Sequence, residues 1–211
     1  MKRVSVLDIG LGNIQCVLQA FEYLGHKVTF LSEAEKVKTA DLIVFPGVGA
    51  FGDGMKKLGA LNLIEPLREH VKAGKPLLGI CLGMQLFLSK SFEFGEHDGL
   101  DYIAGEVLPL RKPVPDDEDY HVPHIGWNDV VFKDCPTHFA ASANNADYYF
   151  CHSYYAQLER EEQSLACCTY GKQEFCAAIV SDNIIGFQFH PEKSGKDGLA
   201  LLKRYCKATG A

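Results

Sequence analysis

Short apolar runs that end in glycine turns alternate with amphipathic stretches over roughly the first ninety residues of the chain. A strand is predicted over 4–9, and after a glycine turn the apolar residues from Ile14 to Leu24 recur at helical spacing. Further strands are predicted over 27–31, 40–45 and 75–80, and a second helix over 58–71. Because parallel strands need crossover connections, this alternation predicts an α/β fold with an open, mostly parallel twisted sheet and helices on both faces.

The second half of the chain changes character, since strand-like runs follow one another with only short polar or glycine turns between them. These runs lie at 102–110, 127–132, 147–156, 165–170, 174–181 and 184–189. Such spacing is typical of additional mixed or antiparallel strands, and one last helix is predicted over 196–207. Because no repeat or flexible linker separates the halves, residues 1–211 are expected to form a single domain.

Composition and charge exclude several classes of protein. The chain is 47% hydrophobic and 23% charged, which is ordinary for a globular protein. The apolar run after Lys2 and Arg3 is too short for a signal peptide or a membrane span. A net charge of -6 with scattered basic residues provides no surface for nucleic acid or anionic lipid, so small molecules or proteins are the expected partners. The acidic, proline-bearing stretch at 111–120 is interpreted as a solvated loop.

Eight cysteines stand at irregular spacings in apolar runs, which favours reduced thiols and a cytoplasmic location over a disulfide framework. Cys-x-x-Cys does not occur, and the one His-x-x-His, from His121 to His124, contains Pro123. Proline makes a helical pair of metal ligands unfavourable there, so no metal site is expected.

A Gly-x-Cys-x-Gly sequence at 79–83 stands where the strand ending at Ile80 meets a helix predicted to begin near Met84. This pattern has the form of a nucleophile elbow, in which flanking glycines permit a sharp strand-to-helix turn. Cys81 is therefore the candidate nucleophile, favoured as a thiolate by the helix N-terminus, and the amide of Leu82 is a candidate oxyanion donor. The alternative is a buried core thiol, which is the interpretation for most of the other cysteines.

The second candidate feature is the segment 187–192, where His190 and Glu192 stand two residues apart. Residues i and i+2 of an extended chain point to the same face, and Pro191 restricts His190 to extended backbone. Glu192 is thus expected to orient the imidazole of His190, whose other nitrogen accepts the thiol proton. Alone, this segment also fits a hydrogen-bonded histidine at a strand end.

A glycine-dense turn at 46–54 follows the strand at 40–45. Its glycines allow the backbone to approach a ligand closely, and the amides of Val48 and Gly49 are candidates for a second oxyanion donor beside Leu82. A phosphate-binding loop is the rival interpretation, but the Lys-Ser/Thr ending of a P-loop and the spacing of a dinucleotide fingerprint are both absent.

Three segments together, at 46–49, 79–85 and 187–194, resemble the class I glutamine amidotransferases in the same order along the chain. Further segments at 10–13, 46–55, 122–128 and 151–155 are similar to the glutaminase subunits of imidazole glycerol phosphate synthases. The resemblance implies a flavodoxin-like fold and release of ammonia from L-glutamine without a cofactor. It also implies a heterodimer in which a cyclase subunit uses that ammonia for histidine biosynthesis.

The resemblance also assigns roles to residues outside the triad of Cys81, His190 and Glu192. It implies glutamine contacts for Gly49, Gln85, His152, Ser153 and Tyr154. It implies positions toward the cyclase partner for Asn13, Trp127, Asn128 and Lys193.

The sequence also allows rival hypotheses about the nucleophile and about the function. Cys151 precedes His152 and Ser153 but lies in a predicted strand without an elbow, so it is rejected as the nucleophile. Another amidotransferase glutaminase, serving anthranilate, nucleotide or pyridoxal phosphate synthesis, is the nearest alternative function. A stand-alone cysteine hydrolase and a catalytically inactive interaction module are more distant ones.

Overall fold

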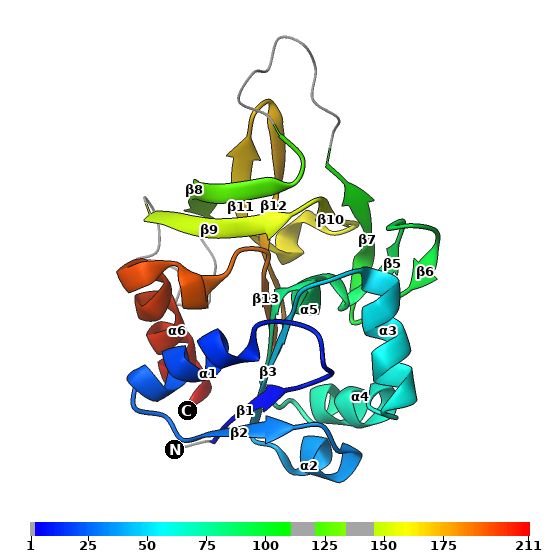
Figure 1. Ribbon diagram of the computed structural model, residues 1–211, viewed down its shortest axis with the longest axis vertical. Coiled ribbons are helices and arrows are strands. Elements are labelled where there is room, and N and C mark those ends of the chain that lie inside the picture. Colours follow the sequence, from blue (N-terminus) through cyan, green and yellow to red (C-terminus); the bar gives the residue numbers. More distant parts are fainter. Residues whose placement is uncertain (1–2, 111–120, 134–145) are drawn as a thin grey trace.

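The computed structural model describes residues 3–110, 121–133 and 146–211 (Figure 1). The acidic loop predicted at 111–120 lies outside the described residues. The described strands join in one sheet whose order begins β2-β1-β3-β4-β13 and continues β12-β10-β7-β5-β6.

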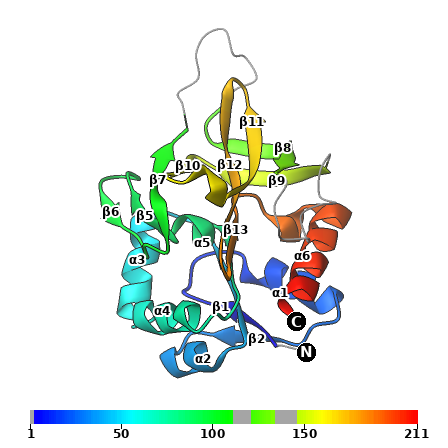
Figure 2. The ribbon, with the colours of Figure 1, turned by 180° about the vertical axis from the view of Figure 1, so that it is seen from behind.

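The first five strands of that order are parallel to one another. They are β2 (Val28–Leu31), β1 (Val4–Leu7), β3 (Leu42–Gly47), β4 (Leu77–Cys81) and β13 (Ile184–Phe187). On one face of this sheet lie α1 (Ile14–Tyr23) and α6 (Gly195–Thr209), and on the other lie α2 (Ala34–Thr39), α3 (Phe51–Ala60) and α4 (Ile64–Lys72) (Figures 1 and 2). The predicted α/β fold with helices on both faces is confirmed.

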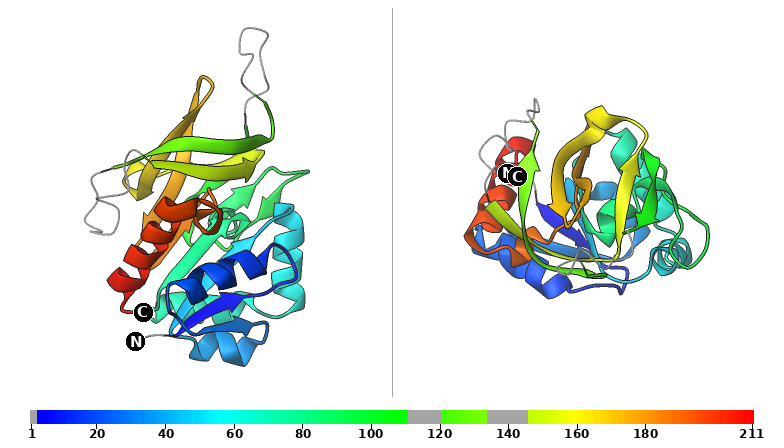
Figure 3. Two further views of the ribbon diagram at one scale, coloured as in Figure 1. Left: turned by 60° about the vertical axis from the view of Figure 1, so that its left-hand side comes forward. Right: turned by 90° about the horizontal axis from the view of Figure 1, so that it is seen from above.

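The remaining described strands form a mainly antiparallel extension. They are β5 (Leu88–Ser91), β6 (His97–Asp98), β7 (Ile103–Pro109), β8 (His124–Phe132), β9 (Ala146–His152), β10 (Tyr154–Leu158), β11 (Ser164–Tyr170) and β12 (Gln173–Ser181). The long strand β12 joins the two parts, because it pairs with β11 along one side and with β13 and then β10 along the other. In consequence β8 and β9 lie beyond the carboxyl ends of the parallel strands (Figures 1 and 3).

Strand periodicity divides the core into two clusters, one on each face of the parallel sheet. Val6 of β1 packs with Phe21 of α1 and Leu202 of α6, whereas the adjacent Leu7 packs with Leu58 of α3 on the opposite face. Burial of both faces explains why the parallel strands are continuous apolar runs. None of the helices in the described ranges is long and apolar enough to cross a membrane.

Two predicted elements are each divided in the structure. The helix predicted over 58–71 is two helices, because Asn62 adopts a left-handed φ of 54° that ends α3 before α4 begins at Ile64. The strand predicted over 147–156 is likewise interrupted at Ser153, between β9 and β10.

Candidate active site

Cys81 ends β4 at the carboxyl edge of the parallel sheet, where ligands bind in open α/β folds. Its backbone adopts φ 54° and ψ -111°, a conformation that non-glycine residues rarely hold. The turn is possible only with glycine on either side: a Cβ on Gly83 would overlap the carbonyl oxygen of Phe45, and one on Gly79 would lie 2.7 Å from the amide of Met84. This is the strained strand-turn-helix geometry of a nucleophile elbow.

The helix after the elbow, α5 (Leu82–Gln85), begins two residues earlier than predicted and has only four residues. A helix dipole requires many aligned peptide groups, so the predicted contribution of a helix N-terminus to Cys81 is small. What the elbow supplies locally is the backbone amide of Leu82, next to the sulfur-bearing residue.

His190 and Glu192 are in contact, through a different local structure from the one predicted. The strand β13 ends at Phe187, and Glu192 lies in a 3-10 turn, η2 (Pro191–Lys193), that folds back on His190. The Nδ1 atom of His190 lies 2.8 Å from Oε1 of Glu192, and both side chains are almost fully buried. The carboxylate therefore fixes the ring and places the proton on Nδ1.

The other ring nitrogen of His190, Nε2, is buried and has no hydrogen-bond partner among the described residues. Burial by itself lowers the pKa of His190, but the Cys81 sulfur and the Glu192 carboxylate beside it raise that pKa overall, to about 10. The raised pKa favours the imidazolium form of His190 beside Cys81, and a neighbouring cation is what a cysteine nucleophile requires.

Backbone contacts from β9 hold the histidine segment in place. The amide of His190 donates to the carbonyl of Tyr149 at 2.8 Å, and the Ser194 hydroxyl donates to the carbonyl of His190 at 2.6 Å. The same hydroxyl accepts from the amide of Tyr149 at 3.0 Å. Because Ser194 is itself buried, this closed set of bonds restricts the backbone that carries the imidazole.

Two groups form hydrogen bonds with the Cys81 sulfur. The thiol donates to the carbonyl of Cys151 at 3.9 Å, and the side-chain amide of Gln188 donates to Sγ at 3.7 Å. Cys151 thus contributes its carbonyl, while its own side chain is exposed and His152 beside it is buried. Its thiol therefore lies on the other face of β9 from the site.

Nearly the whole chain matches one family model, described as glutamine amidotransferase class-I, over residues 5–207. The chain belongs to the class I glutamine amidotransferases. Its relatives include subunit HisH 1 of imidazole glycerol phosphate synthase from Legionella pneumophila (strain Paris), which is 44% identical over 210 residues, covering 97% of this chain and 99% of that protein. Subunit HisH from Geobacter sulfurreducens is 43% identical over 206 residues, covering 97% and 98%.

Among solved structures, PurLQS from Thermotoga maritima matches this amidotransferase with a TM-score of 0.73 at 18% identity, over 98% of this chain and 99% of that chain. At this identity the likeness concerns the fold alone.

Three of the residues predicted to contact glutamine, Gln85, His152 and Tyr154, are joined by hydrogen bonds. The amide of Gln85 donates to the carbonyl of Tyr154 and to Oε1 of Gln188, each at 2.9 Å. Nδ1 of His152 donates to the same Tyr154 carbonyl at 2.8 Å, and its Nε2 lies 3.1 Å from Nδ1 of His124. Burial lowers the pKa of His124 to about 4 and that of His152 to about 3, so both are neutral. Glutamine contact by Gln85, His152, Ser153 and Tyr154 stays a prediction.

The glycine turn predicted over 46–54 is shorter than expected, because α3 already begins at Phe51. Gly47 pairs with Cys81 across β3 and β4, so the next residues, Val48 and Gly49, lie beside the elbow. Gly49 has a φ of 123°, which glycine alone adopts easily. The candidate oxyanion donors are therefore close to Cys81 along the sheet edge, and their role stays a prediction.

Sequence patterns single out neither Glu93 nor Gln188, and both lie at this edge. Glu93 accepts from the amide of Phe51 at 2.6 Å, and burial raises its pKa. Gln188 carried one signal, since it is a polar residue between Phe187 and Phe189 in an otherwise apolar strand.

The predicted partner-facing residues differ in orientation. Trp127 is 52% exposed, its ring centroid lies 6.1 Å from that of Tyr149, and Lys193 stands over the same tyrosine ring at 5.7 Å. Asn13 is exposed before α1. Asn128 differs, because its amide donates to the carbonyl of Thr169 at 3.1 Å within the chain. Contact of all four with a partner stays a prediction.

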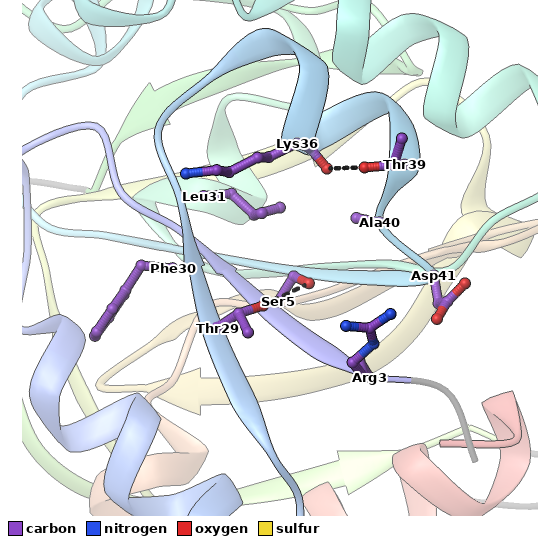
Figure 4. A pocket seen from close by; sticks show the side chains of 9 residues that line it. All are labelled: Arg3, Ser5, Thr29, Phe30, Leu31, Lys36, Thr39, Ala40 and Asp41. Atoms are coloured by element: carbon purple, nitrogen blue, oxygen red, sulfur yellow. Dashed lines mark hydrogen bonds between the residues drawn. The ribbon is translucent and has the colours of Figure 1, made fainter.

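A hollow of about 410 Å³ lies elsewhere, between the start of β1, β2 and α2 (Figure 4). Its lining includes Arg3, Ser5 and Lys36 and none of the predicted site residues, and the hydroxyls of Ser5 and Thr29 bond each other at 3.2 Å. Because β3 separates β1 and β2 from β4 in the sheet, this hollow lies apart from the elbow at Cys81.

Proposed function

We propose that this chain is the glutaminase subunit of an imidazole glycerol phosphate synthase. It hydrolyses L-glutamine to glutamate and ammonia and passes the ammonia to a cyclase subunit. That subunit makes imidazole glycerol phosphate and aminoimidazole carboxamide ribotide in histidine biosynthesis. The observation that carries the glutaminase step is the meeting of three buried side chains at the carboxyl edge: the strained Cys81 and the His190–Glu192 pair. The HisH relatives support the choice of synthase.

The reaction begins with the thiolate of Cys81, which attacks the side-chain amide carbon of glutamine. The amides of Leu82 and of the turn at Val48 and Gly49 stabilise the oxyanion, each by about 100-fold to 1,000-fold in rate. His190 donates its Nε2 proton to the departing ammonia, which leaves a thioester on Cys81.

Water then completes the cycle. His190, now neutral, removes a proton from water, and the resulting hydroxide attacks the thioester to give glutamate and regenerate the thiolate. Glu192 stabilises the imidazolium whenever it forms, and keeps Nε2 directed away from the carboxylate. These steps need neither a metal nor an organic cofactor.

An exposed apolar strip supports a protein partner near this site. Ile125, Trp127 and Val131 of β8 are each more than half exposed, and alternate residues of one strand share a face. The ring of Tyr149 lies between Trp127 and the active-site histidine. The centroids of the Tyr149 and His190 rings are 6.3 Å apart. Exposed apolar patches typically mark interaction sites. We assign the cyclase to this surface, where ammonia enters it without escaping to water.

The proposal includes a cytoplasmic heterodimer. All seven described cysteines are free, which fits a reducing compartment.

Substitution of the nucleophile in the assembled complex tests the proposal. Cys81→Ala removes synthesis that depends on glutamine but spares synthesis from added ammonium salt, since the cyclase site is untouched. Loss of both activities in a complex shown by gel filtration to assemble would overturn the proposal. So would co-purification of the chain with a different synthase and no affinity for a cyclase.

A further inference from the structure

Gln188 lies where a polar side chain is unfavourable unless fully hydrogen-bonded. It has no exposed surface, and neither have Phe187 and Phe189 on either side. A buried amide without partners destabilises a fold by about 1–3 kcal/mol. Both polar atoms of this amide do have partners: Oε1 accepts from Gln85, and Nε2 donates to Sγ of Cys81.

The direction of these bonds is determined by a backbone group. The carbonyl of Tyr154 can only accept, so the Gln85 atom that lies 2.9 Å from it must be the amide nitrogen. That nitrogen also lies 2.9 Å from Gln188, so the Gln188 atom facing it must be the oxygen. The nitrogen of Gln188 is then left to face Cys81, at 3.7 Å. A flipped Gln188 would set two N–H groups against each other.

Gln188 and His190 therefore act on the same sulfur from one segment of chain, but with different roles. Nε2 of His190 is buried beside that sulfur and bonds no other group among the described residues, so it is available to exchange a proton with the sulfur. Gln188 is anchored at its oxygen and neutral, so it cannot take the proton of the thiol.

We propose that Gln188 is a positioning residue that orients the Cys81 sulfur and stabilises it as the thiolate. An N–H donor binds an anionic acceptor more strongly than a neutral one, so this bond favours thiolate over thiol. Gln85 and the Tyr154 carbonyl act one step further out, because they hold the amide of Gln188 in the donating orientation. The inference rests on the proposed role of Cys81 as nucleophile.

The test measures the thiol itself rather than glutamine turnover. Iodoacetamide alkylates thiolates without needing the glutamine site, and mass spectrometry of the Cys81 peptide separates this residue from the other cysteines. In Gln188→Met, which preserves length and apolar packing but removes the donor, the pH midpoint of Cys81 alkylation rises by about one unit. Alkylation near neutral pH is then slower by about 10-fold.

Gln163→Met is the matched control. Gln163 is also a buried glutamine with a side-chain donor bond, to the Ser181 hydroxyl at 3.2 Å, and it lies outside the site. Its substitution reports the effect of losing a buried amide on stability and leaves the midpoint of Cys81 unchanged. A second variant, Gln85→Met, frees Gln188 without touching the sulfur and raises the midpoint by a smaller amount.

A raised midpoint in either site variant, with the control unchanged, supports the inference. Midpoints equal to wild type in both would overturn it and reduce Gln188 to a structural role, whatever the loss in stability. Failure of the proposed function looks different: the wild-type chain in the complex would then fail to hydrolyse glutamine, whatever the order of the alkylation midpoints.

Discussion

Cys81 retains a backbone conformation that costs about 1–3 kcal/mol, because the surrounding residues leave it no alternative. Gly79 and Gly83 admit the turn, and the carbonyl of Phe45 lies where a larger residue would need space. The same strain projects the sulfur toward His190. At the scale of single residues, close packing therefore fixes the nucleophile Cys81, and a hydrogen bond to Glu192 fixes the base His190.

Glu192→Gln tests how the charge of Glu192 acts on His190. The pKa of His190 is raised in the folded protein from 6.5 to about 10, so protonated His190 stabilises the fold fully below pH 6.5. That stability is lost as the pH rises toward 10. Glu192→Gln is therefore expected to lower the free energy of unfolding by about 1 kcal/mol or more near pH 6, and by less near pH 9.5.

Urea unfolding at the two pH values measures this difference. Glu65→Gln is the control, because Glu65 pairs with Arg68 at an exposed site and its removal has a small effect without this pH dependence. A deficit of Glu192→Gln that grew with pH would contradict the assigned role of the carboxylate.

The site residues that could be predicted from the sequence are those whose role is indicated by residues next to them in the chain. The elbow at Cys81 is predictable because its glycines are adjacent to it. The pairing of His190 with Glu192 was predicted from strand parity, although a 3-10 turn makes the contact. The role of Gln188 could not be predicted, because its contact with Cys81 joins residues that are 107 positions apart in the sequence.

At the scale of elements, the elbow packs tightly against β3, whereas the surface of α3 is open. Adding a methyl group at a glycine is therefore expected to change stability in opposite directions at the two places. Gly83→Ala introduces a Cβ into the carbonyl of Phe45 and is expected to lower the free energy of unfolding by about 3 kcal/mol or more. Gly59→Ala, in α3, meets nothing within 4 Å and is expected to raise it by about 0.5–1 kcal/mol.

Thermal or denaturant unfolding of both variants beside wild type gives the answer. Equal stability of Gly83→Ala and wild type would mean that the elbow is not tightly packed against β3.

Elements with strong periodicity were predicted well and interruptions were not. The parallel strands are continuous apolar runs, so their positions follow from the sequence. The break between α3 and α4 depends on Asn62 adopting a left-handed conformation, which a helical pattern of apolar residues does not reveal. The interruption at Ser153 depends on partners in distant strands, since its carbonyl accepts from the amide of Leu110.

At the scale of the whole molecule, the two parts of the sheet meet at the site. The parallel strands bring Cys81 and the segment after β13 to one edge, and β9 approaches that edge with the Cys151 and Tyr149 carbonyls. The outer face of β8 remains exposed beside it (Figure 3). The exposed face of β8 is therefore close to the edge of the sheet that carries the Cys81 sulfur.

Trp127→Ala is expected to weaken binding of the cyclase by roughly 10-fold to 100-fold, because exposed tryptophans are frequent anchors of interfaces. Stability of the isolated chain should change little, since the side chain is about half exposed. Titration calorimetry with the cyclase measures the affinity. Tyr23→Ala, at the far end of α1, is the matched control with an exposed aromatic ring; equal affinities of the two variants would place the interface elsewhere.

The covalent intermediate is the most direct test of the central claim that Cys81 is the nucleophile. The complex is mixed with L-glutamine, quenched in acid within the first turnovers, and digested for mass spectrometry. We expect a γ-glutamyl group on the peptide that contains Cys81, and we expect it to disappear when water is given time to react. Glutamine consumption without that adduct, or with the adduct on another residue such as Cys151, would contradict it.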